Sequence, residues 1–178
     1  MPCRMLWDKG VREFVDAAKK IKDKYPEINF ILSGPYEDQN PGKVPKEYLN
    51  KLNTLGVVKW MGDTKDMPKL YEKSTVVVLP SYYNEGLPKV LLEAGASGRP
   101  VITSDMPGCK DAVENNKTGL IIPKENPEAL YQAMEQLILD EALILKMSQS
   151  ARIKAEKKFD VRQVIVAHIN IYKELSKS

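Results

Sequence analysis

The stretch TVVVLPSYYNEGLPKVLLEAGAS, residues 75–97, carries the pattern that decides the fold. Its first five residues, 75–79, are apolar or β-branched and are followed by a proline, which is typical of a buried strand. Residues 87–97 are mostly apolar helix formers, and Pro88 suits the first turn of a helix. Gly86 lies between the two parts and permits a sharp turn. The stretch therefore predicts a strand, a tight turn and a helix in succession.

The same alternation runs along the whole chain. Short apolar runs bounded by glycine or proline predict strands at residues 29–32, 56–60, 75–79, 100–103 and 119–122. Helical spacing or capping residues predict helices at about 11–21, 66–73, 87–97, 126–137, 141–158 and 161–176. This order predicts an α/β fold, a Rossmann-like, doubly wound parallel sheet with helices on both faces.

Two further segments bear on how the sheet is built and where it binds ligands. Residues 33–44 contain two prolines and two glycines without periodicity, so we expect a surface loop at the carboxyl end of a strand. Ligands bind at that end of open α/β sheets. Residues 4–6 resemble the tail of a first strand whose beginning is missing, so we expect the chain to be a fragment of a longer protein.

Composition excludes several classes of protein. The 178 residues suit one domain with a sizeable core, and no apolar run approaches the roughly 20 residues of a membrane span. The net charge of +3 is too balanced to predict a nucleic-acid partner. Cys3 and Cys109 imply no disulfide framework, which fits a reducing cytoplasm. The lysine-rich stretches 19–24 and 154–158 are interpreted as solvated helix faces, with weak attraction to an anionic membrane as the alternative.

The predicted turn and helix around Gly86 carry the candidate chemistry. Unpaired backbone N–H groups at a helix start, with the positive end of the helix dipole, bind anions. Glu85 lies in the turn, and Glu93 lies about two helical turns later among apolar residues. Glu93 either reaches solvent or pairs with Arg99, or it points with Glu85 into a cleft where both carboxylates accept hydrogen bonds from ligand hydroxyls.

His168 is the sole histidine of the sequence. It falls within an apolar stripe of the last predicted helix, so we interpret it as a packed or half-exposed helix residue rather than a catalytic one. It is left out of the candidate site.

The spacing Glu85-x7-Glu93, in the setting PSYYNEGLPKVLLEAGASGRPVI, resembles the signature of family 4 glycosyltransferases with the GT-B fold. Other segments resemble the family in the same order: RMLWDKG, VVKWMG, LYEKSTVVVLPS, GRPVITSD and TGLIIP. The resemblance covers the whole chain. It implies that residues 1–178 form the nucleotide-sugar donor-binding half of a GT-B enzyme, with the N-terminal acceptor-binding domain absent.

The resemblance implies catalytic roles for Arg4, Lys9 and Glu85. Arg4 and Lys9 match the basic pair that holds the donor diphosphate, where fixed cations stabilise the negative charge that develops as the nucleoside diphosphate departs. Glu85 matches the acid that grips hydroxyls of the transferred sugar. The spacing of the basic pair varies within the family, so the contact of each cation stays open.

The resemblance also implies a set of substrate-binding residues. Gly86 and Leu87 match positions that offer backbone N–H groups to the sugar and phosphate, Thr64 matches the position that reads the base, and Glu93 matches the acid that binds both ribose hydroxyls. The full set is Gly34, Thr64, Lys69, Gly86, Leu87, Lys89, Val90 and Glu93. Gly34 matches the phosphate-side loop of the family, where this sequence has Ser33-Gly34-Pro35 and the family often has Gly-x-Gly.

By this resemblance the whole enzyme transfers a hexose or N-acetylhexosamine from a nucleotide sugar, most simply a UDP-sugar, with retention. The acceptor is a polysaccharide or lipid-linked glycan, bound through the missing domain, and the fragment alone is expected to be inactive. No metal or other cofactor is implied, since there is no Asp-x-Asp motif and no His/Cys cluster. We expect a cytoplasmic protein, with peripheral association of the whole enzyme at the inner face of the membrane.

Two alternatives stay open, a GT-B epimerase and a non-enzymatic nucleotide-binding module. Arg4, Lys9, Glu85 and Glu93 argue against the module, because a scaffold would not need all four.

Overall fold

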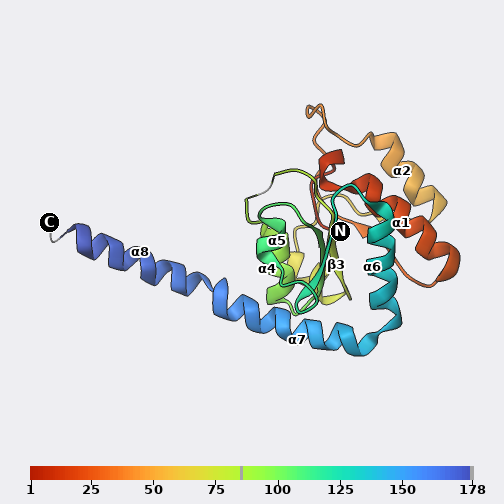
Figure 1. The fold of residues 1–178 in the computed structure, drawn as a ribbon. Coiled ribbons are helices and arrows are strands. Elements are labelled where there is room, and N and C mark those ends of the chain that lie inside the picture. Colours follow the sequence, from red (N-terminus) through yellow and green to blue (C-terminus); the bar gives the residue numbers. More distant parts are fainter. Residues whose placement is uncertain (85, 177–178) are drawn as a thin grey trace.

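Short parallel strands alternate with helices in the computed structural model, which describes residues 1–84 and 86–176 (Figure 1). The strands are β1 (Ile31–Leu32), β2 (Lys59–Trp60), β3 (Val77–Leu79), β4 (Val101–Ser104) and β5 (Gly119–Ile122). The helices are the 3-10 helix η1 (Trp7–Lys9) and α1 (Val11–Lys24), α2 (Lys46–Leu55), α3 (Met67–Glu72), α4 (Lys89–Ala96), α5 (Cys109–Ala112), α6 (Pro127–Leu139), α7 (Glu141–Lys158) and α8 (Val161–Leu175). The predicted α/β class is confirmed.

All strand pairs are parallel among the described residues. β3, β4 and β5 form one sheet in that order, and β1 pairs with β2. Residues 1–3 run beside the end of β1, since the backbone N–H of Cys3 donates to the carbonyl of Ser33 at 2.9 Å. They form only an isolated parallel bridge there and no regular strand. Met1 and Cys3 pack against both hydrophobic clusters of buried residues.

The start of the chain differs in detail from the prediction. The tail of a first strand was expected at residues 4–6, but the strand-like pairing is at residues 1–3. Leu6 instead forms an isolated antiparallel bridge with Lys43. After Cys3 the chain leaves the sheet and enters η1 at Trp7.

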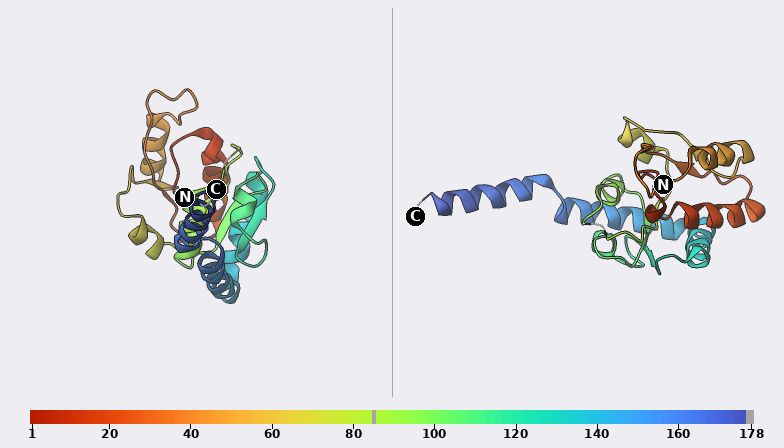
Figure 2. Two further views of the ribbon diagram at one scale, coloured as in Figure 1. Left: turned by 90° about the vertical axis from the view of Figure 1, so that its left-hand side faces the viewer. Right: turned by 90° about the horizontal axis from the view of Figure 1, so that it is seen from above.

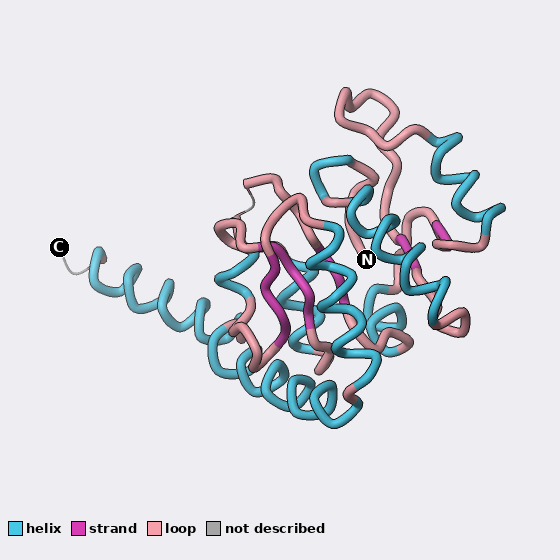
Figure 3. Tube along the Cα trace, turned by 45° about the vertical axis from the view of Figure 1, so that its right-hand side comes forward, coloured by secondary structure: helices cyan, strands magenta, loops and turns pink. Residues whose placement is uncertain are grey.

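Helices cover both faces of the sheet, as the continuous apolar runs of the strands require. In Figure 1, α1 and α6 lie on one side of β3, and α4 and α5 lie on the other. α1 packs against α6, and α4 packs against α7. Figure 3 shows the longer strands enclosed by these helices. The doubly wound arrangement predicted from the sequence is therefore confirmed.

The start of α6 follows the predicted capping chemistry. The side chain of Asn126 accepts a hydrogen bond of 2.9 Å from the backbone N–H of Ala129, and Pro127 occupies the first position of α6. Asp66 caps α3 through the backbone N–H of Lys69 at 3.1 Å. α4 begins two residues later than predicted, because Pro88 is its N-cap residue rather than its first turn.

Besides the 3-10 helix η1, the two α-helices α2 and α5 were not predicted. α2 buries only Leu49 and Leu52, so its sequence lacks the apolar stripe that periodicity detects. α5 is a single turn of four residues, too short to carry a period. The predicted loop at residues 33–44 is confirmed, since it contains no helix and only isolated bridges.

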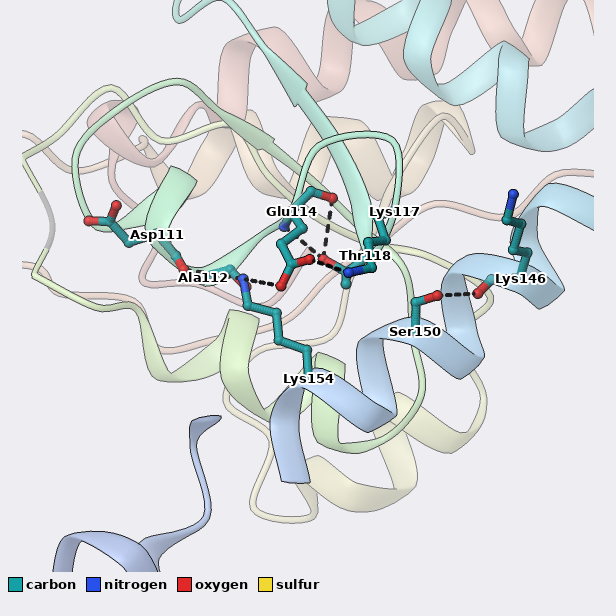
Figure 4. Close-up of polar contacts among 8 residues, drawn as sticks. All are labelled: Asp111, Ala112, Glu114, Lys117, Thr118, Lys146, Ser150 and Lys154. Atoms are coloured by element: carbon teal, nitrogen blue, oxygen red, sulfur yellow. Dashed lines mark hydrogen bonds and ion pairs between the residues drawn. The ribbon is translucent and has the colours of Figure 1, made fainter. Parts of the chain in front are cut away.

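α7 is held to the end of α5 by a buried lysine. Nζ of Lys154 donates to the carbonyls of Asp111 at 3.3 Å and Ala112 at 3.0 Å, and it lies 3.9 Å from Oε1 of Glu114 (Figure 4). Lys117 pairs with the same carboxylate at 2.7 Å. The prediction that the lysines of residues 154–158 form a solvated face is wrong for Lys154, because the α5 carbonyls and Glu114 compensate its burial.

α8 projects away from the rest of the chain (Figures 1 and 2). It buries no side chain, and His168 is exposed, so the predicted packing of this helix is wrong within the described residues. The reason is that no described element lies against its apolar face. No helix in the described ranges is both long and apolar enough to span a membrane.

Candidate functional site

The turn from Arg4 to Gly10 lies against the end of β3. Gly10 has φ of +80°, and a Cβ atom there would lie 2.3 Å from the carbonyl oxygen of Pro80. Only glycine permits both the left-handed conformation and this close approach. The sequence signal for this contact is the pair Lys9-Gly10 before an amphipathic helix.

One carbonyl ties this turn to the segment after β3. The oxygen of Asp8 accepts hydrogen bonds from the backbone N–H of Tyr82 at 2.9 Å and of Tyr83 at 3.3 Å. The hydroxyl of Ser81 donates to the same oxygen at 3.1 Å. Residues 8 and 81–83 are therefore fixed relative to each other, although more than seventy residues separate them in sequence.

The two predicted cations of this turn have different surroundings. Lys9 is buried, and its Nζ lies 4.7 Å from the centroid of the Tyr83 ring. Arg4 is exposed, and its NH1 lies 3.3 Å from Oε1 of Glu37 in the loop after β1. To bind an anion, the guanidinium of Arg4 must either leave Glu37 or contact Glu37 and the anion together. Lys9 is already held inside the turn.

The segment from β3 to α4 presents a helix start to the same region. No side chain of the described residues caps the N-terminus of α4, where Pro88 is the N-cap residue. Lys89 is the first residue of the helix and is exposed, while Val90 is half-buried. Gly86 and Leu87 are exposed beside them. This helix start can therefore accept an anion through its backbone N–H groups. Glu85 lies outside the described residues.

Glu93 has a partner that the sequence did not indicate. It is exposed on α4, and its Oε2 accepts a hydrogen bond of 2.9 Å from the hydroxyl of Tyr71. The pairing of Glu93 with Arg99, one of the predicted alternatives, is not found, because Arg99 donates to the carbonyl of Glu72 at 3.1 Å. Tyr71 is a buried residue of α3. The signal in the sequence that could have indicated it is its position in the short helix predicted before β3.

The ends of β1 and β2 meet beside Arg4. Gly34 has φ of +148°, and a Cβ atom there would lie 1.8 Å from the carbonyl oxygen of Cys3. The backbone N–H of Gly34 donates to the carbonyl of Gly62 at 2.8 Å. The hydroxyls of Ser33 and Thr64 are 2.5 Å apart. Only glycine allows residue 34 to approach the backbone of Cys3 this closely. The predicted loop position is therefore occupied by glycine for a steric reason.

Lys69 stands somewhat apart from the other predicted residues. It is exposed on α3 and lines an open hollow of about 510 Å³. The other residues that line this hollow are Asp66, Pro68, Glu72, Ser97 and Arg99. None of the other predicted site residues that the structure describes lines it, so this hollow does not join Lys69 to the turn around Lys9.

Three carboxylates influence Tyr82, which the sequence analysis did not single out. Burial raises the pKa of the Tyr82 hydroxyl, and the carboxylates of Glu13, Asp8 and Glu125 raise it further. Burial also raises the pKa of Glu13. Oδ1 of Asp8 and Oε2 of Glu13 are buried without a hydrogen-bond partner among the described residues. The hydroxyl of Tyr82 therefore remains protonated and can donate a hydrogen bond.

Several of the predicted site residues lie at the edge where the parallel strands end. Arg4 follows the segment beside β1, Gly34 follows β1, Thr64 follows β2, and the anion-binding helix start follows β3. This is the edge at which open α/β sheets bind ligands. The contacts through Asp8, Gly34 and Tyr71 link these segments to each other and to Glu93.

The family comparison identifies the chain. The family described as "Glycosyl transferases group 1" matches residues 1–157. The chain belongs to the group 1 glycosyltransferases. The resemblance seen in the motifs around Glu93 is therefore confirmed, and the α/β domain with parallel strands is a glycosyltransferase domain.

Curated and solved relatives agree with this assignment. The chain is 34% identical, over all 178 residues and 45% of the relative, to the N,N'-diacetylbacillosaminyl-diphospho-undecaprenol alpha-1,3-N-acetylgalactosaminyltransferase of Campylobacter jejuni. A glycosyltransferase structure from Rickettsia africae superposes with a TM-score of 0.87 at 26% identity, covering 100% of this chain and 47% of that one. Anabaena HepE in complex with UDP has the same fold, with a TM-score of 0.84 at 24% identity over 99% and 47% of the two chains.

This glycosyltransferase chain spans about half the length of the relatives that it matches. The comparisons identify the family and the fold. The individual roles of Arg4, Lys9, Glu93 and the other site residues stay predictions.

Proposed function

We propose that this chain binds the nucleotide-sugar donor of a retaining glycosyltransferase. The observation that carries the proposal is the junction at the Asp8 carbonyl, which holds the turn containing Lys9 against residues 81–83. Beyond that junction lies the start of α4, which no side chain of the described residues caps. A buried cation and a helix N-terminus on adjoining segments suit the diphosphate of a nucleotide sugar.

Each group near this junction has a task in the proposed reaction. Lys9 and Arg4 bind the diphosphate and stabilise the charge that develops on it as the bond to the anomeric carbon breaks. The backbone at Gly86 and Leu87 and the start of α4 donate to phosphate and sugar oxygens. Glu85 accepts hydrogen bonds from hydroxyls of the transferred sugar. The departing phosphate helps to deprotonate the acceptor hydroxyl on the same face, so the anomeric configuration is retained.

The remaining residues bind the nucleoside. Glu93 accepts hydrogen bonds from both ribose hydroxyls, since a carboxylate has lone pairs for several donors and Tyr71 uses one oxygen. Thr64, beside Ser33 at the ends of β1 and β2, offers its backbone to the base. Lys69 lies just beyond the base-binding position. Lys89 and Val90, at the start of α4, are proposed to lie near the diphosphate, and Gly34 belongs to the phosphate-side loop.

The donor is proposed to be a UDP-hexose or UDP-N-acetylhexosamine. Support comes from Anabaena HepE, whose structures are described in complex with UDP and with UDP-glucose. The Campylobacter jejuni relative acts, by its name, on a diphospho-undecaprenol glycan, which supports a polysaccharide or lipid-linked acceptor. Transfer itself is proposed for a longer protein that includes this chain, working in the cytoplasm or at the inner membrane face. No metal is proposed, because Arg4 and Lys9 supply the cations.

Calorimetric titration of this chain with UDP, GDP and ADP tests the proposal. We expect UDP to bind most tightly and the chain alone to transfer no sugar, because catalysis needs donor and acceptor held together. Failure of all three nucleotides to bind would contradict the proposed function. Robust transfer by the purified chain to a defined acceptor would contradict the expected inactivity.

Lys9→Ala sharpens this experiment. It should weaken UDP binding about tenfold or more, since a charge-assisted hydrogen bond contributes about 1.5–3 kcal/mol. Lys20→Ala is the matched control, because Lys20 is an exposed lysine paired with Glu128 on the α1–α6 surface. The loss caused by Lys9→Ala should shrink as salt rises if the site is open to solvent.

A further inference from the structure

Lys9 and Tyr83 form a cation–π pair at the proposed diphosphate site. Nζ of Lys9 lies 4.7 Å from the centroid of the Tyr83 ring, within the range of an energetically significant contact. Lys9 is only 5% exposed, whereas Tyr83 is 52% exposed. The half-exposed ring is therefore one of the groups that cover the ammonium.

The backbone holds both members of this pair. The N–H of Tyr83 donates to the carbonyl of Asp8, the residue before Lys9, at 3.3 Å. The same N–H lies 3.3 Å from the hydroxyl of Ser81, which itself donates to Asp8. Because these bonds join the two chain segments directly beside the pair, the ring and the ammonium stay close without relying on the side chains alone.

We propose that Tyr83 is a positioning residue for Lys9, which holds the ammonium in place for the donor diphosphate. The inference rests on the proposed function. A lysine side chain loses considerable rotamer freedom when a ligand fixes it. The ring of Tyr83 contacts the ammonium before the ligand arrives, so part of that loss occurs in the unliganded chain. The ammonium carries three N–H donors, which it can direct to phosphate oxygens when the diphosphate binds.

Two substitutions separate the ring from the hydroxyl. Tyr83→Leu removes the ring face and should weaken UDP binding about 3-fold to 30-fold, the range expected for a cation–π contact between exposed and desolvated limits. Tyr83→Phe keeps the ring face and should bind UDP within about twofold of the wild type. Uridine, which has no phosphate, should bind all three proteins equally. Tyr172→Leu, an exposed tyrosine on α8, is the matched control and should change nothing.

A double-mutant cycle with Lys9→Met identifies the route of the effect. In the Lys9→Met background, Tyr83→Leu should cause no further loss of UDP affinity, because the ammonium that the ring holds is gone. An equal loss in both backgrounds would mean that Tyr83 contacts the ligand itself, and it would overturn the inference. Binding of UDP to Tyr83→Leu as tightly as to the wild type would also overturn it.

The outcomes for the two proposals are distinguishable. If the wild-type chain binds no nucleoside diphosphate, the proposed function fails and this inference fails with it. If the wild type binds UDP but Tyr83→Leu loses affinity for uridine as much as for UDP, only the inference fails, because the effect is then structural. Circular dichroism melts of each variant check that the fold is intact, and Tyr83→Met, which also lacks the ring, replaces Tyr83→Leu if that variant unfolds.

Discussion

The hydroxyl of Tyr71 donates a hydrogen bond of 2.9 Å to Oε2 of Glu93, joining α3 to α4. Tyr71 is 2% exposed, and burial together with the neighbouring Glu93 carboxylate raises the pKa of its hydroxyl. The hydroxyl therefore stays a hydrogen-bond donor through the neutral pH range. It fixes one oxygen of Glu93 and so orients the carboxylate for other donors.

Glu93→Ala should remove the recognition of the ribose. Two charge-assisted hydrogen bonds are lost, so UDP affinity should fall about tenfold or more. The variant should bind 2′,3′-dideoxy-UDP about as well as UDP, whereas Lys9→Ala should still prefer UDP. Calorimetry with both ligands measures the discrimination. If Glu93→Ala discriminates as strongly as the wild type, Glu93 does not bind the ribose.

Tyr71→Phe should reduce that same discrimination without removing it. The ring packing is kept, but one oxygen of Glu93 loses the donor that orients it, a bond to a charged group of about 1.5–3 kcal/mol. Tyr131→Phe is the matched control, since the hydroxyl of Tyr131 donates to Glu135 at 2.6 Å on α6. Both variants are compared by the ratio of UDP to dideoxy-UDP affinity. An unchanged ratio in Tyr71→Phe would show that Glu93 does not need this support.

Gly34→Ala should destabilise the fold by about 3 kcal/mol, because strain at positive φ and a backbone clash both contribute. The added Cβ would lie 1.8 Å from the carbonyl oxygen of Cys3, which no side-chain rotation relieves. Gly56→Ala is the control, since Gly56 has φ of +67° and no atom within 4 Å of its Cβ position. It should lose only about 1 kcal/mol. Urea unfolding measures both, and equal losses would contradict the steric argument.

Glu13→Gln should stabilise the chain at neutral and alkaline pH. Burial raises the pKa of Glu13 above its ordinary value of 4.5, so the folded state binds the proton more tightly than the unfolded state. The stability from protonated Glu13 is complete below about pH 4.5 and is lost as pH rises through the raised pKa. The gain from the amide should therefore be present at about pH 8 and vanish near pH 4 in thermal melts.

Glu47→Gln is the control for this pH dependence. Glu47 occupies the first turn of α2, as Glu13 occupies the first turn of α1, but it is exposed. It should change the stability by less than about 0.5 kcal/mol at either pH, as is usual for an exposed surface substitution. A Glu13→Gln variant that is less stable than the wild type at alkaline pH would contradict the role of burial.

Substitutions on α8 should leave the stability of the domain unchanged. Ile165 and Ile169 are 50% and 45% exposed, so Ile165→Ala and Ile169→Ala should each stay within about 0.5 kcal/mol of the wild type. Ile21→Ala, at a fully buried position of α1, should cost about 2–5 kcal/mol. Chemical denaturation compares the three. A loss at Ile165 as large as that at Ile21 would mean that α8 packs against the domain in solution.

Much of the fold was predictable because local patterns report burial. The strand β5 was predicted with its observed bounds, and the other strands within two or three residues, because continuous apolar runs belong to strands covered on both faces. The cap and proline at the start of α6 located that helix for the same local reason. α2 escaped prediction because two buried leucines do not make a stripe.

By itself, the sequence determined the family, the alternation of strands and helices, and the chemistry of the candidate residues, because motif spacing and apolar periodicity are local properties. Only the tertiary structure decided that the Asp8 carbonyl anchors residues 81–83, that Tyr71 holds Glu93, and that the Tyr83 ring covers Lys9. It also decided that Arg4 meets Glu37 and that α8 buries nothing. Each of these contacts joins segments brought together by sheet packing, and no period or motif within one segment encodes a neighbour on another.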